Sequence, residues 1–63
     1  MRKLKSRMIL FEDTMQTLAE YLGISRQTLS GRMNGHSSFK TDEIVMIADR
    51  YSLSSEDIVE IFF

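Results

Sequence analysis

The sequence contains no cysteine, no proline and no tryptophan, and its single histidine is His36. Without cysteine no disulfide forms, and one isolated histidine cannot build a structural zinc site. The longest apolar run, from Met8 to Phe11, is far shorter than the roughly 20 residues that a membrane-spanning helix needs. We therefore expect a cytoplasmic protein without a metal, a cofactor or a membrane anchor.

The chain has 63 residues, enough for one small domain, because a chain of about this size buries only about 60% of the surface that it exposes when unfolded. Apolar residues make up 43% and charged residues 27% of the sequence, a balance typical of folded proteins. We predict a single domain over residues 1–63. With no disulfide to stabilise it, its core must come from well-packed helices or from a partner chain.

Charge is divided unequally along the chain although the net charge is only -1. Residues 1–40 carry seven basic and three acidic side chains, whereas the residues from Thr41 onward carry six acidic side chains and one basic, Arg50. Such asymmetry suggests one face that meets a polyanion.

Helical spacing of apolar residues, with no alternating run of β-branched ones, predicts five helices and no strand. The predicted helices run from about Lys3 to Phe11, Met15 to Leu22 and Arg26 to Met33, then from Thr41 through Tyr51, and from Ser54 onward. The expected N-caps are Thr14, Ser25, Thr41 and Ser54. The residues predicted to be mostly buried are Leu18, Ala19, Leu22, Leu29, Ile44, Ile47, Ile58 and Phe62.

The segment from Thr14 to Gly35 has the spacing of two helices that cross steeply over a short turn. This crossing needs a small residue at the close approach, a turn residue that tolerates positive φ, and apolar anchors on both sides. Ala19 and Gly23 supply the first two. The anchors are Leu18, Leu22, Ile24 and Leu29. Ser25 then caps the second helix, whose first residues project outward.

This segment resembles the DNA-binding helix-turn-helix of the lambdoid phage Cro and repressor proteins. The later pattern Asp42-Glu-Ile44, Ile47-Ala48 and Leu53 through Ile58 is similar to the last helices of that five-helix fold. The stretches Leu29 to Gly35 and Glu60 to Phe63 look most like small Cro-like proteins of Gram-positive phages and prophages. The resemblance implies an all-α, compact, five-helix lambda-repressor-like DNA-binding domain.

The function that the resemblance implies is sequence-specific transcriptional regulation. A Cro-like repressor of this kind would occupy operator DNA and exclude polymerase or a competing repressor. Its partners would be double-stranded DNA and a second copy of the chain, at least on DNA, at the nucleoid of a bacterial host. We expect no sensor domain in a chain this short.

In that family the first residues of the second motif helix contact base edges in the major groove. The implied base-contacting residues are Arg26, Gln27, Thr28 and Ser30. The implied phosphate-contacting residues are Gln16, Arg32, Asn34, His36 and Lys40. Arginine pairs with guanine O6 and N7, glutamine with adenine N6 and N7, and the threonine methyl group with thymine.

Three residues depart from the family pattern. Met15 stands where glutamine is common, and Gly31 where another base-reading side chain is common. Arg32 stands where many relatives have an apolar anchor. We expect Met33, four residues after Leu29, to take over that packing and to leave Arg32 free for phosphate.

Alternatives to these interpretations remain open. The basic stretch from Arg2 to Arg7 is either an ordinary polar helix face or a phosphate-contacting one. The acidic second half also suits a protein-interaction module on the same fold, such as an anti-repressor or modulator that complexes a phage repressor. We do not expect an enzyme: the acid pairs at 42–43 and 56–57 lie in first turns of helices, where the helix dipole explains them. Phe62 and Phe63 cannot both face inward, so one is expected to meet a second copy.

Overall fold

Five α-helices and no strand make up the computed structural model, which describes all residues 1–63. The helices are α1 (Arg2–Leu10), α2 (Met15–Leu22), α3 (Arg26–Met33), α4 (Thr41–Tyr51) and α5 (Ser55–Phe62). The prediction of five helices is confirmed. The first helix lies one residue earlier than expected, because Phe11 forms its C-cap instead of its last turn.

Side-chain caps set most of the helix starts. The Thr14 hydroxyl accepts from the Thr17 amide at 3.1 Å, and Ser25 and Ser54 cap α3 and α5 in the same way. In α4 the predicted cap is wrong: Lys40, not Thr41, is the N-cap. The start moves back one residue because Glu43 Oε1 accepts from the backbone amide of Lys40 at 2.8 Å.

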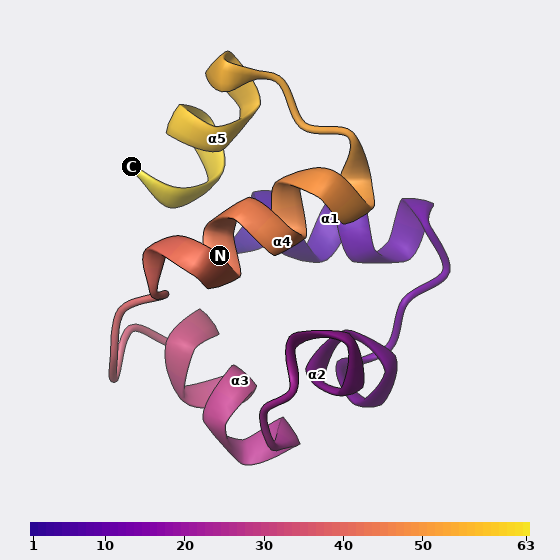
Figure 1. The fold of residues 1–63 in the computed structure, drawn as a ribbon, viewed down its shortest axis with the longest axis vertical. Helices are drawn as coiled ribbons and strands as arrows, with labels where there is room; N and C mark the ends of the chain where they lie inside the picture. Colours follow the sequence, from indigo (N-terminus) through magenta and orange to yellow (C-terminus); the bar gives the residue numbers. More distant parts are fainter.

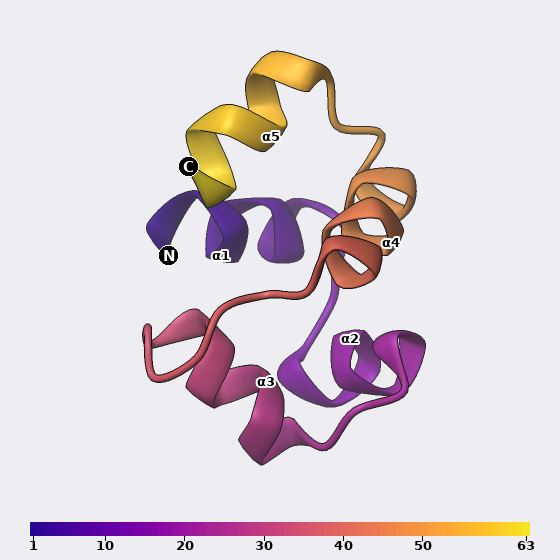
Figure 2. The same cartoon turned by 60° about the vertical axis from the view of Figure 1, so that its left-hand side comes forward.

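The helices are arranged in three tiers along the longest axis of the molecule (Figure 1). Helices α2 and α3 lie at one end, α5 lies at the other, and α1 and α4 lie between them. Figure 2 shows the same order from a second direction. The molecule measures 27 × 23 × 20 Å, so every helix has a large share of its surface in solvent.

The core lies where the middle tier meets α2 and α3. Its nine buried apolar residues are Leu4, Met8, Leu18, Ala19, Leu22, Leu29, Met33, Ile47 and Tyr51. Three residues predicted to be in the core, Ile44, Ile58 and Phe62, are only half-buried. Ile58 and Phe62 belong to α5, and Ile44 lines a hollow together with Phe62. Helix α5 contributes no fully buried residue because it covers only one side of the middle tier. The Phe62 ring packs edge-on against Phe39, with ring centroids 5.4 Å apart.

Candidate nucleic-acid interface

Helices α2 and α3 are joined by the three-residue turn Gly23, Ile24 and Ser25. Gly23 has φ of 73°, the left-handed conformation in which side chains are strained. The amide of Ile24 donates to the Ala19 carbonyl at 3.0 Å, which closes the end of α2. Ser25 Oγ then accepts from the Thr28 amide at 3.0 Å and opens α3. The turn geometry is as the sequence predicted.

Helix α3 has one buried side and one exposed side. Leu29 and Met33 enter the core, as expected for the residues that anchor this helix. The first-turn side chains of Arg26, Gln27 and Thr28 are all exposed. The helix is therefore anchored from behind while its first turn presents hydrogen-bonding groups to solvent.

Two of the four predicted base-contacting residues have local hydrogen bonds. The Thr28 hydroxyl accepts from Ser25 Oγ at 2.9 Å, so its oxygen belongs to the cap. Ser30 is half-buried, and its Oγ accepts from Asn34 Nδ2 at 3.2 Å. Arg26 and Gln27 make no side-chain contact with any other residue's polar group, so their hydrogen-bonding capacity is unused.

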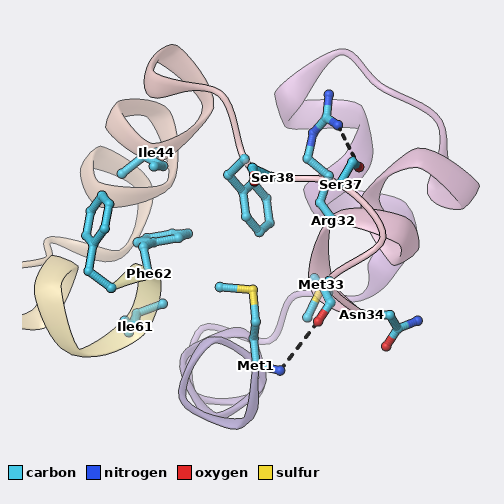
Figure 3. A pocket seen from close by; sticks show the side chains of 12 residues that line it. Met1, Arg32, Met33, Asn34, Ser37, Ser38, Ile44, Ile61 and Phe62 are labelled. Atoms are coloured by element: carbon cyan, nitrogen blue, oxygen red, sulfur yellow. Dashed lines mark hydrogen bonds between the residues drawn. The ribbon is translucent and has the colours of Figure 1, made fainter.

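The structure does not leave Arg32 free for phosphate. Its guanidinium forms a two-pronged pair with Glu43, with Nε 2.7 Å from Oε1 and Nη2 3.1 Å from Oε2. Nη1 donates to Ser37 Oγ at 3.1 Å (Figure 3). Both charged side chains are largely buried. The expectation that Arg32 is free is therefore wrong, because this side chain joins α3 to the start of α4.

The other predicted phosphate contacts are exposed and lie on separate elements. Gln16 is in the first turn of α2, and its Nε2 donates to Glu20 Oε2 at 2.9 Å. Asn34 follows α3, His36 lies in the next loop, and Lys40 caps α4. No hydrogen bond joins any two of these four residues.

The division of charge seen in the sequence is partly cancelled in the fold. The Nζ atom of Lys3 lies 3.6 Å from Glu60 Oε2, and Arg7 Nη2 lies 3.1 Å from Asp57 Oδ1. Two basic side chains of α1 therefore pair with acidic side chains of α5. The cap contact from Ser54, with Arg7 beside it, lowers the pKa of Asp57. The basic side chains outside any ion pair are Arg2, Lys5, Arg26 and Lys40.

A second charged cluster was not expected from the sequence. Arg50 holds Asp13 with two hydrogen bonds of 2.7 and 2.6 Å, and the Tyr51 hydroxyl donates to the same carboxylate at 2.7 Å. The hydrogen bond from Arg50 keeps the pKa of Asp13 well below its usual range. Arg50 also lies 4.5 Å from the centre of the Tyr21 ring. We call this cluster of Asp13, Arg50 and Tyr51 the Asp13 clamp; it joins the α1–α2 turn to α4.

An open hollow of about 620 Å³ lies between the end of α5, the loop after α3 and the N-terminal residue (Figure 3). Met1, Ile61 and Phe62 give it an apolar lining on one side, while the Arg32–Ser37 contact borders the other. The terminal amine of Met1 donates to the Met33 carbonyl at 3.5 Å. The hollow is distinct from the exposed first turn of α3.

None of the five helices is long and apolar enough to cross a bilayer. No group of three or more His, Asp or Glu side chains is placed to hold a metal ion. No curated protein and no solved structure matches the chain. One protein family matches over residues 1–63, the whole of the chain. The chain belongs to this family, DUF739, which is described as a protein of unknown function.

Proposed function

We propose that this protein is a sequence-specific DNA-binding regulator of the Cro-like type, with α2 and α3 as a helix-turn-helix. The observation that carries the proposal is the two-sided build of α3. Leu29 and Met33 fix the helix in the core, and Arg26 and Gln27 stand exposed on its first turn with no partner in the protein. A recognition helix must be held firmly in the core and must also present free hydrogen-bond donors and acceptors to the DNA.

The exposed groups suit base edges in the major groove. The Arg26 guanidinium can donate two hydrogen bonds, to guanine O6 and N7, and the Gln27 amide can pair with adenine N6 and N7. The Thr28 hydroxyl is engaged by Ser25, so its methyl group is the part left for a thymine methyl. Ser30, half-buried and bonded to Asn34, has a smaller share in base reading in this proposal.

Phosphate contacts come from the sides of α3. Gln16, Asn34, His36 and Lys40 are exposed around it, and Lys40 carries an unpaired charge. Such contacts set the register of the protein on the duplex without reading sequence. Arg32 is not part of this set, because Glu43 already holds it.

The mode of action of the Cro and repressor proteins is part of the proposal. Bound at an operator, a domain of this size excludes polymerase or a competing repressor by occupying the site. Operators with two half-sites mirror a two-fold protein, so we include a second copy of the chain as a partner on DNA. Phe63, 87% exposed at the end of α5, is the side chain that we assign to this contact.

A protein-interaction module is the second candidate, favoured by the apolar side chains at the end of α1. Ile9 is 76% and Leu10 72% exposed, which is unusual for neighbouring large apolar residues. A partner such as a phage repressor would cover them. The net charge of -1 also suits a protein partner better than DNA.

Selection of bound duplexes from a random-sequence library separates the two candidates. The proposal predicts that the purified protein enriches a short consensus, and that Arg26→Ala and Gln27→Ala each lose the preference at one or two positions of it. Folding of each variant is checked by circular dichroism. A folded protein that enriches no sequence would contradict DNA recognition and favour the interaction module.

A further inference from the structure

The basic residues of α1 are divided between two sides of the helix. Lys3 and Arg7 lie on the side that faces α5, where Glu60 and Asp57 pair with them. Lys5 is about 200° around the helix from Lys3, by the α-helical repeat. It lies against residues of α2 and α3 and forms no ion pair.

Lys5 borders a small open notch of about 230 Å³ between the three helices at this end of the fold. The notch is lined by Lys5, Met15, Ser30, Met33 and Asn34. None of these residues is acidic, so the ammonium group of Lys5 has no counter-charge there. Asp13 borders a neighbouring hollow together with Lys5, but Arg50 and Tyr51 already hold its carboxylate.

The polar groups of this Lys5 notch are mostly donors. Asn34 uses one amide N–H to reach Ser30 Oγ, which leaves its second N–H free. Ser30 accepts that bond and keeps its own hydroxyl proton for donation. With the three protons of Lys5, the notch offers donors from α1 and α3 around one small volume, an arrangement suited to the oxygens of an anion.

The notch is continuous with the exposed face of α3. Arg26, Ser30 and Asn34 are spaced four residues apart and so form one stripe along the helix and its cap. If Arg26 enters the major groove, Asn34, at the other end of this stripe, lies toward the sugar–phosphate backbone of the DNA strand that borders the groove. An anion in the notch would then be part of the same DNA.

We propose that the Lys5 notch binds one backbone phosphate of DNA, with Lys5 as its charged contact and Ser30 and Asn34 as hydrogen-bond donors. This inference rests on the proposed function and extends the interface from α3 onto α1. It also assigns different roles to two lysines that are two residues apart in α1. Lys5 contacts DNA, while Lys3 pairs with the acidic side chain of Glu60 on α5.

Paired substitutions in α1 provide the test. Lys5→Gln and Lys3→Gln remove the same charge from the same helix, so they are matched for net charge. Binding to a selected duplex and to a scrambled one is measured at several salt concentrations, and circular dichroism melts confirm that both variants fold. For Lys5→Gln we expect weaker binding to both duplexes and a log-log salt slope smaller by about one. Between 50 and 200 mM salt, the wild type should therefore lose about 3.5-fold more affinity than Lys5→Gln.

For Lys3→Gln we expect a salt slope like that of the wild type, because this substitution removes only the exposed ion pair with Glu60. An unchanged slope in Lys5→Gln, or equal losses in the two variants, would overturn the assignment while leaving the proposed function intact. A failure of DNA binding itself is visible in the wild type, which would then bind neither duplex, and it would overturn both.

A double-mutant cycle tests the notch as a unit. Asn34→Ala alone should weaken binding to both duplexes, and in the Lys5→Gln background its effect should shrink, since both side chains would contact the same phosphate. Additive effects of the two substitutions would place them on different phosphates and overturn the shared notch.

Discussion

Helices α3 and α5 have the same length, eight residues, and both start at a serine N-cap, yet they are held in opposite ways. The more polar helix, α3, inserts Leu29 and Met33 fully into the core. The more apolar one, α5, buries no residue completely and is fastened by Lys3–Glu60, Arg7–Asp57 and the Phe39–Phe62 contact. Hydrophobic content alone therefore does not show how firmly a helix is seated.

The difference has a functional meaning under our proposal. A recognition helix must keep its position on DNA while most of its surface stays free, and two well-buried anchors achieve this with few residues. Helix α5 has apolar surface left over, including Val59 and Phe63, which suits it to a contact with another chain. In this proposal, the two ends of the molecule therefore bind different partners: DNA at α3 and a second copy of the chain at α5.

The largest effect is expected from Leu29→Ala in α3. Leu29 is fully buried, so the cavity and the lost transfer free energy should lower the free energy of unfolding by about 2 to 4 kcal/mol. Val59→Ala in α5, where the side chain is 58% exposed, is the matched control and should change it by less than about 0.5 kcal/mol. Similar losses in urea titrations of the two variants would break the contrast between the helices.

A smaller effect is expected when the Asp13 clamp is removed. Asp13→Asn deletes the charge that Arg50 and Tyr51 contact, so the free energy of unfolding should fall by about 1 to 3 kcal/mol at neutral pH. Asp57→Asn, which weakens the exposed Arg7 contact and the Ser54 cap contact at the start of α5, should cost less.

The effect of the clamp should depend on pH. Because folding lowers the pKa of Asp13, its contribution is fully present above the unfolded value of about 4 and declines as the pH falls below it. The difference in stability between wild type and Asp13→Asn should therefore shrink between about pH 6 and pH 3. Denaturant titrations at these pH values check it, and a constant difference would contradict the lowered pKa.

The smallest effect on stability is expected from Phe63→Ser at the end of α5. Because this side chain is mostly in solvent, the melting temperature should hardly change. Cooperative binding to a duplex with two half-sites should nevertheless weaken, since the apolar contact between copies would be lost. Sedimentation with and without DNA measures this. If the variant bound with wild-type cooperativity, Phe63 would take no part in the contact between copies.

Local signals in the sequence predicted the α2–α3 end of the fold well. Thr14, Gly23 and Ser25 act within a few residues of their positions, through caps and a left-handed turn, so their effect can be derived without knowing the rest of the fold. The positive φ angles of Glu12 and Ser52 had no such signal, because neither residue is one that usually ends a helix in this way.

Contacts between distant residues were not predictable in the same way. Asp13 and Arg50 are 37 positions apart, and nothing in either segment indicates the other. Glu43 looked sufficiently explained by the dipole of α4, and Arg32 looked free, until the fold brought them together. The exposure of Arg26 and Gln27 was predictable because exposure on a first turn is a local property, whereas their proposed contact with DNA bases came from the resemblance.

The central claim is that α3 reads DNA sequence, and the affinities of Arg26→Ala and Gln27→Ala test it most directly. Each is titrated against the selected duplex and a scrambled duplex, with Val45→Ala, at an exposed position of α4, as a folded control. The account predicts a loss of about 1 to 3 kcal/mol on the selected duplex, little change on the scrambled one, and wild-type behaviour for the control. Wild-type affinity of both α3 variants for the selected duplex would contradict it.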